Sequence, residues 1–158
     1  MRKVIVLLLV SILLLSGCQA MQTRPTVQYV STQYYPDAGY PHQMIIHSKA
    51  ELWEYYETLS ARHADLAGAT YIADVNLEEP FAQYDDAYFL DNILVIVVWA
   101  TGSGGDRFQV TKAEKENETL TVHIKQTNDG MTCDMAAWHF LIELDKKYDA
   151  NEVSIIEK

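Results

Sequence analysis

The sequence predicts an α+β domain in which an antiparallel β-sheet or sandwich of about six or seven strands carries one packed amphipathic helix. Three observations lead to this class. They are a capped helical pattern over about residues 49–62, a continuous apolar run from Ile93 to Trp99, and alternating apolar residues in the second half of the chain. Because no internal repeat or change of composition divides the chain, we expect one domain over residues 27–158.

The first half of this domain begins with two short strand patterns, and the helix follows them. Residues Val27–Gln33 are rich in β-forming side chains, and Gln43–His47 is a second short strand. Ser48 and Glu51 form a capping box, with serine at the N-cap and glutamate three residues later. An apolar stripe at helical spacing then marks the packed face of the helix: Leu52, Tyr55, Tyr56 and Leu59.

The second half of the domain is dominated by strand patterns. Residues Tyr71–Val75 are a candidate strand, and Asp85–Leu90 is a short helical turn that ends before Asn92. The run Ile93–Trp99 is apolar throughout, which is typical of a central strand covered on both faces. Further strands are indicated by the alternating residues Phe108, Val110 and Lys112, by Leu120, Val122 and Ile124 with His123 on the opposite face, by Trp138, Phe140, Ile142 and Leu144, and by the closing segment Val153–Ile156.

Residues 1–17 are predicted to be a bacterial lipoprotein signal peptide. Two basic residues precede an apolar stretch, Val4–Leu15, of 12 residues, which is shorter than a spanning helix of about 20. Leu15-Ser16-Gly17-Cys18 resembles the lipobox of bacterial lipoproteins, in which the cysteine receives a diacylglyceryl group and the signal is cut before it. The resemblance implies that lipid on Cys18 holds the mature protein on the extracytoplasmic face of the cell membrane or cell envelope.

The predicted mature chain is short-tethered and acidic. Residues 18–26 form the lipidated N-terminus and tether, and the eight residues 19–26 reach at most about 26–29 Å. Removal of the signal leaves ten basic side chains against 22 acidic ones, a formal charge of −12. Because this charge repels phosphates, we expect no nucleic-acid partner, and lipid rather than surface charge must supply membrane attachment.

Cys133 is left without an intramolecular partner once Cys18 carries lipid. It can be a small buried hydrophobic side chain, form an intermolecular disulfide or act as a reactive thiol. Paired with His139 it suggests an alternative function, a small cell-envelope hydrolase or thiol enzyme. However, His139 has the strand parity opposite to Trp138, which predicts that it faces solvent or a second layer.

Histidines and aromatic residues offer two weaker signals. Neither His42 with His47 nor His139 with Glu143 has the dense spacing of a metal site, so we expect no metal or cofactor. A turn-rich loop holds the best candidates for exposed aromatic side chains, which suit a sugar- or peptide-binding surface: Tyr34, Tyr35 and Tyr40. A small-ligand-binding lipoprotein is a further alternative, and it requires a concave pocket with convergent polar groups.

The glycine-rich segment after Thr101 is the most distinctive part of the mature chain. Three glycines within residues 102–105 permit close approach of the backbone. A phosphate-binding loop would need a following helix, whereas this segment leads into a strand. We therefore expect a hairpin or crossover between two strands, whose residues are candidates for contact with a partner protein: Gly102, Ser103, Gly104, Gly105 and Asp106.

Residues 84–146 resemble the C-terminal domain of PrcB-type proteins. The motifs that carry this resemblance are Tyr88-Phe89 in an acidic turn, the apolar run ending at Trp99, the loop Gly102-Ser103-Gly104-Gly105, and Met131-Thr132 after an alternating strand. Family members are exported and often lipid-anchored, and the named member supports the stability of a partner protease. The resemblance implies a non-enzymatic accessory module without catalytic residues, in which Asp106 replaces the tyrosine usual in the family.

Overall fold

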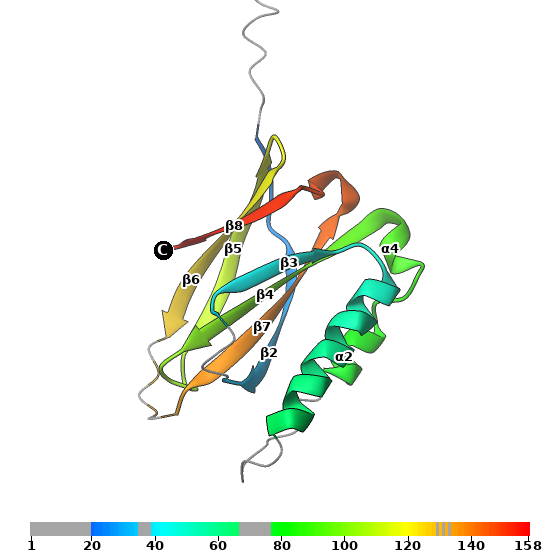
Figure 1. Cartoon of the computed structure of the whole chain (residues 1–158). Coiled ribbons are helices and arrows are strands. Elements are labelled where there is room, and N and C mark those ends of the chain that lie inside the picture. Colours follow the sequence, from blue (N-terminus) through cyan, green and yellow to red (C-terminus); the bar gives the residue numbers. More distant parts are fainter. Residues whose placement is uncertain (1–19, 35–38, 67–76, 129, 131, 133) are drawn as a thin grey trace, which may run out of the picture.

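The computed structural model describes residues 20–34, 39–66, 77–128, 130, 132 and 134–158. Two four-stranded β-sheets pack face to face, and helices cover the outer face of one of them, as Figure 1 shows. The uncovered sheet has the strand order β1-β5-β6-β8, and the covered sheet has the order β2-β7-β4-β3. The predicted α+β sandwich with a helix packed on it is confirmed.

The described residues contain eight strands. In chain order these are β1 (Met21–Thr23), β2 (Thr26–Gln33), β3 (His42–Ile46), β4 (Asn92–Thr101), β5 (Arg107–Glu116), β6 (Thr119–Asn128), β7 (Ala136–Asp145) and β8 (Glu152–Glu157). The helices are α2 (Lys49–Leu66), α3 (Glu78–Ala82) and α4 (Tyr88–Asp91), and a 3₁₀ turn, η2 (Lys146–Tyr148), leads from β7 towards β8.

The covered sheet is the middle layer of the molecule, and its central strands supply two cores. Alternate side chains of a strand point to opposite faces, so β4 contributes to both cores. Ile93, Val95 and Val97 pack against the other sheet, whereas Leu94, Ile96 and Val98 pack under the helices. The apolar run at 93–99 is therefore the predicted central strand with both faces buried.

Helix α2 begins where the capping pattern predicts. The Ser48 hydroxyl accepts the backbone N–H of Glu51 at 3.2 Å, and the Glu51 carboxylate accepts the N–H of His47 at 2.7 Å. Both bonds satisfy backbone donors that the first helical turn leaves unpaired. The helix continues to Leu66 rather than ending near residue 62, and α3 and α4 add buried Phe81 and Phe89 beside it. The helical turn predicted at Asp85–Leu90 is thus confirmed as α4, whereas α3 was not predicted.

Three details of the sheets differ from the prediction. There are eight strands in the described residues, because Met21–Thr23 pairs with β5 as β1 instead of belonging to the tether. Strand β8 runs parallel to β6, whereas an antiparallel sheet was expected. The cause is that η2 carries the chain from the end of β7 into the other sheet, next to the start of β6. The candidate strand Tyr71–Val75 lies outside the described residues.

A β-bulge in β5 corrects the expected placement of two residues. The register shifts between Val110 and Lys112, so Lys112 lies opposite His123 and does not share a face with Val110. His123 is on the face opposite Leu120, as predicted, yet it is only 5% exposed. Its cross-strand neighbours, Lys112 on β5 and Ile156 on β8, flank it on that outer face.

Candidate partner-binding site

Several chain segments meet at one end of the covered sheet. Strands β2 and β4 end there, and the neighbouring antiparallel strands β7 and β3 begin there. The register places Ala136 beside both Gln33 and Thr101, so the connections at these strand ends lie together. Residues 102–106 also lie here, as the crossover from β4 to β5 in the other sheet. We call this part of the molecule the glycine-loop end.

Hydrogen bonds from the segment before β7 hold the crossover in shape. The Ser103 hydroxyl, which is buried, accepts the backbone N–H of Thr132 at 3.1 Å and lies 2.7 Å from the Thr132 hydroxyl. The Thr132 hydroxyl in turn accepts the N–H of Gly105 at 3.0 Å. The N–H of Gly104 donates to the carbonyl of Asp134 at 2.9 Å. These hydrogen bonds restrict the backbone conformation of the loop.

Asp106 is an internal acceptor of this loop. Its side chain is 8% exposed, accepts the N–H of Gly130 at 2.7 Å, and also binds the Thr101 hydroxyl. A Cβ atom at Gly130 would overlap the backbone of Gly105 and Asp106, so only glycine fits this close approach. Of the five predicted contact residues, Ser103 and Asp106 thus point their side chains inward. The N–H and carbonyl groups of Gly104 and Gly105 are already hydrogen-bonded, whereas Gly102 is exposed, so the loop can offer a partner mainly the backbone at Gly102.

Charged groups surround the crossover. The Arg107 guanidinium donates to the carbonyls of Gly104 and Asp106 at 3.0 and 2.8 Å, and it lies 5.2 Å from the centre of the Trp138 ring. Hydrogen bonds from the Thr132 side chain and from the N–H of Gly104 hold the pKa of Asp134 below its ordinary value of 3.8. Arg107 and Asp134 therefore place opposite charges beside the same loop, where both bond to Gly104.

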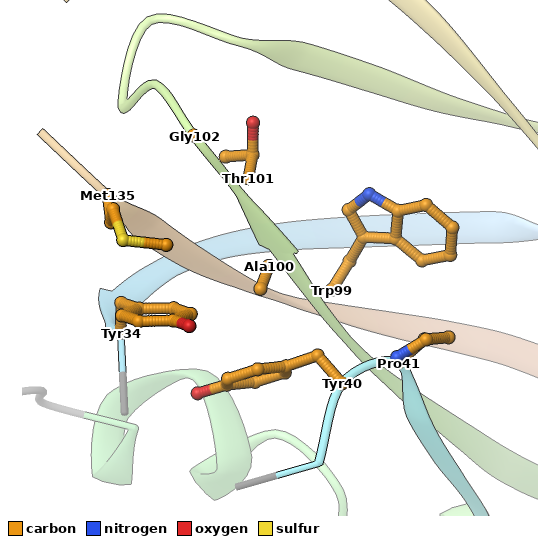
Figure 2. A pocket seen from close by; sticks show the side chains of 8 residues that line it. All are labelled: Tyr34, Tyr40, Pro41, Trp99, Ala100, Thr101, Gly102 and Met135. Atoms are coloured by element: carbon orange, nitrogen blue, oxygen red, sulfur yellow. The ribbon is translucent and has the colours of Figure 1, made fainter. Parts of the chain in front are cut away.

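An aromatic hollow of about 410 Å³ opens beside the crossover (Figure 2). The Tyr34 and Tyr40 rings stack with centroids 5.4 Å apart and planes inclined by 25°. Figure 2 shows Tyr34, Tyr40 and Met135 gathered on one side of the end of β4, while the Trp99 indole extends away from them. Met135 is 56% exposed. The remaining lining residues are Pro41, Ala100, Thr101 and Gly102.

This hollow brings together the predicted aromatic loop and the predicted contact loop. Tyr34 and Tyr40 belong to the predicted aromatic loop, and Gly102 belongs to the predicted contact loop. Tyr35 lies outside the described residues. Both tyrosines are half-buried rather than freely exposed, because their rings pack on each other at the sheet end.

Sequence reasoning did not identify Arg107, Thr132, Asp134 or Met135 as parts of this site. The bonds of Thr132 and Asp134 to the loop span 27 and 30 residues. These bonds form because β7 pairs with β4, and no local sequence pattern indicates that pairing. Trp99 was assigned only to the apolar strand, although its position as the last bulky residue before the glycines could have drawn attention to it.

A second hollow, of about 370 Å³, lies between α2 and the edge strand β3. Met44, Ile46 and Leu59 contribute its apolar lining, and Glu51 and Glu54 contribute carboxylates. It contains none of the residues that the sequence analysis proposed for partner contact. The glycine-loop end is therefore the stronger candidate.

His139 is buried beneath α2, on the second layer that its strand parity allowed. Its Nδ1 lies 3.0 Å from the Thr32 hydroxyl, and its Nε2 lies 2.7 Å from the Tyr55 hydroxyl. Thr32 also donates to the carbonyl of Ala137 at 3.3 Å, and a hydroxyl has only one proton. With Thr32 as the donor to that carbonyl, Thr32 accepts from Nδ1–H of His139, and Nε2 accepts from the Tyr55 hydroxyl. Use of His139 as a base would require this network to open.

The other site predictions concern Cys18, Cys133 and metal ligands. Both cysteines lie outside the described residues. Glu143, which shares a strand face with His139, accepts a hydrogen bond from Tyr84 at 3.2 Å. Among the described residues, no three His, Cys, Asp or Glu side chains are grouped as metal ligands. Within the same part of the chain, no helix combines the length and apolarity needed to cross a membrane.

Comparison with known proteins gives no assignment: no family model, curated protein or solved structure matches this chain.

Proposed function

We propose that this protein is a non-enzymatic, lipid-anchored lipoprotein whose domain binds another exported protein at the glycine-loop end. The lipobox at Cys18 supports the location, and the resemblance of residues 84–146 to PrcB-type domains supports the accessory role. The resemblance also suggests the class of partner, an extracytoplasmic protease whose stability or activity the bound domain modulates.

The observation that best supports this proposal is that an aromatic hollow lies directly beside a loop held rigid by hydrogen bonds. Protein interfaces are enriched in aromatic residues, methionine and arginine, and Tyr34, Tyr40, Met135 and Arg107 gather here. Because internal hydrogen bonds already order residues 102–106, a partner loses little affinity to loop ordering. An apolar side chain of the partner fits the hollow, while polar groups of the partner meet the exposed backbone at Gly102.

Crosslinking on intact membranes, followed by isolation of the lipoprotein, tests the proposal. Two substitutions alter the site without disturbing packing. Met135→Glu charges a side chain that is 56% exposed, and Gly102→Gln extends into space where a Cβ meets nothing within 4 Å. Glu116→Gln, on the exposed turn at the opposite end of β5, is the matched control.

We expect the wild type and the Glu116→Gln variant to recover one stoichiometric partner, and both site variants to recover less of it. The abundance of that partner should fall when the lipoprotein is deleted. Recovery of no partner, or equal recovery by all four proteins, would contradict the proposal.

The size of the hollow favours a second candidate, a small-ligand-binding lipoprotein. Its volume of about 410 Å³ falls within the usual range for small-molecule sites, about 300–1,000 Å³. In that case cell-envelope extracts freed of protein should raise the thermal unfolding midpoint of the wild type and not that of Met135→Glu. An accessory module without a small ligand would show no shift for either protein.

A further inference from the structure

The chain between Cys18 and the fold is much shorter than the eight-residue tether expected from sequence. Strand β1 begins at Met21, and its three residues pair with Lys115, Glu114 and Ala113 of β5. Only Gln19 and Ala20 therefore separate Cys18 from a hydrogen-bonded strand. The three Cα–Cα steps from Cys18 to Met21 span at most about 10–11 Å.

This attachment point lies at one end of the sandwich, which we call the anchor end. Met21 is opposite Lys115, which immediately precedes the β5–β6 turn at residues 116–119. The N–H of Asn151 donates to the carbonyl of Glu118 at 2.9 Å, so the connection from η2 to β8 lies at the same end. His47, just before α2, also lies at this end, because its Nε2 is 2.8 Å from the Asp149 carboxylate.

The glycine-loop end is at the other end of the same strands. Arg107, which follows the crossover, is the first residue of β5, and Lys115, which pairs with Met21, is the last but one. The eight residue steps between them correspond to about 26 Å of strand. In Figure 1 the start of β1 and the β5–β6 turn lie at the top, and the β4–β5 connection lies at the lower left. A tether of about 10 Å cannot bring the far end of β5 to the bilayer if β5 stands upright.

The broad faces of the molecule are unsuited to lie on lipid. The helical face is acidic: residues 77–86 contain four acidic side chains and no lysine or arginine, and α2 adds exposed Glu51, Glu54 and Glu57. Such a face is repelled by anionic headgroups. The outer face of the other sheet carries the ion pair of Lys112 with Glu114, which would have to be desolvated against lipid.

The anchor end carries acidic side chains as well, but it also exposes apolar ones. Leu90 on α4 is 72% exposed, and Met21 is 38% exposed. Leu90 belongs to this end because Asn92, two residues later, is opposite Asp145 at the end of β7. Lys146 comes directly after Asp145, and its ammonium group donates to the carbonyl of Phe89 at 3.4 Å. Lysine beside exposed leucine suits the interfacial region of a bilayer.

We propose that the domain stands on the membrane by its anchor end, with β5 upright and the glycine-loop end directed away from the bilayer. This inference rests on the proposed lipidation of Cys18. It means that the lipid surface contacts Met21, Leu90 and the β5–β6 turn, and that a partner reaches the aromatic hollow from the side away from the membrane.

Short-range fluorescence quenching from lipid headgroups tests this orientation. The lipidated full chain, purified from membranes, is reconstituted into phosphatidylcholine and phosphatidylglycerol vesicles with or without a spin label on the headgroup. A Cys133→Ser background leaves no other free thiol, because a lipidated Cys18 is a thioether. An environment-sensitive fluorophore is then attached at Glu116→Cys or at Thr127→Cys, two exposed positions at opposite ends of the β5–β6 hairpin.

We expect the spin-labelled headgroups to reduce the fluorescence at position 116 and to leave that at position 127 unchanged. Both labelled proteins should have the same thermal unfolding midpoint as their Cys133→Ser parent. Equal quenching at both positions means that the domain lies flat, and stronger quenching at 127 means that it is inverted; either overturns the orientation.

Vesicle flotation separates this failure from failure of the anchor. If the purified chain floats with vesicles and a Cys18→Ser variant does not, lipidation holds and the quenching result decides the orientation alone. If the wild-type chain does not float, lipid anchoring is wrong and the orientation fails with it.

Discussion

Buried polar side chains control the local shape of this domain. The described residues include five buried polar or charged side chains: Thr32, Ser103, Asp106, His123 and His139. Each makes at least one hydrogen bond, although Nδ1 of His123 and the indole N–H of Trp138 are buried without a partner among the described residues. A buried polar group without a partner costs about 1–3 kcal/mol. Asp106 illustrates the consequence. An aspartate directly after two glycines suggests an exposed contact, yet here it ties the crossover to Gly130.

Glu114 gives the domain a pH-dependent contribution to stability. It accepts from Lys112 at 2.6 Å and lies 2.7 Å from Nε2 of His123, and these bonds hold its pKa below the ordinary value of 4.5. A carboxylate whose pKa is lowered on folding stabilises the fold above the unfolded pKa, and the contribution is lost as pH falls through the folded pKa. We therefore expect Glu114→Gln to unfold at lower urea concentration than the wild type at neutral pH.

The difference between these two proteins should shrink as the pH is lowered below 4.5, since the wild-type carboxylate then becomes protonated. Urea denaturation across this pH range measures it. Glu116→Gln is the control, because Glu116 is exposed and its side chain makes no hydrogen bond to a described residue. A stability gap between Glu114→Gln and the wild type that is the same at every pH would contradict the expected linkage.

At the scale of elements, local signals place α2 and tertiary contacts attach it. Ser48 and Glu51 determine where the helix begins, because capping acts within one turn. Leu52 and Tyr55 then pack on the covered sheet, as the helical spacing predicted. The polar attachment through Tyr55, His139 and Thr32 was not predictable, since Thr32 and His139 are 107 residues apart.

Removal of the Tyr55 hydroxyl should weaken this attachment of α2. Tyr55→Phe leaves Nε2 of His139 without the donor that lies 2.7 Å away. The expected loss in free energy of unfolding is about 1–3 kcal/mol, the cost of leaving a buried acceptor unsatisfied. Tyr56→Phe is the matched control on the same helix, because no hydrogen bond of the Tyr56 hydroxyl occurs within the described residues. Equal stability of the two variants in urea would contradict the role of the network.

At the scale of the whole molecule, the middle sheet makes the three layers interdependent. Strand β7 sends Phe140 and Ile142 into the core between the sheets and Leu141 into the core under the helices. Loss of either outer layer would therefore expose one apolar face of the same strands. The helical layer and the sandwich should unfold together.

The three tryptophans allow this cooperativity to be measured. Trp53 is on α2, whereas Trp99 and Trp138 pack at the core between the sheets. In a Trp53→Phe variant, fluorescence reports the sandwich alone, while far-UV circular dichroism includes α2. We expect the two urea transitions to coincide, as in a two-state domain. A fluorescence transition at higher urea than the dichroism transition would mean that the helices detach first.

Elements with local signals can be placed from the amino-acid sequence alone. The capping pair at Ser48 and Glu51, the apolar run of β4 and the alternation in β6 and β7 each act through neighbouring residues. These signals were sufficient for the fold class and for the position of the glycine crossover. The predicted lipid anchor at Cys18 also comes from a local motif.

How these elements meet depends on contacts between residues far apart in the chain, which the structure reveals. The tertiary structure paired β1 with β5 and so shortened the tether, set β8 parallel to β6, turned Asp106 inward, and assembled the aromatic hollow from three segments. The physical reason is that strand pairing joins residues far apart in the chain. Local propensity specifies that a segment is a strand, whereas burial of both faces of the middle sheet selects its neighbours.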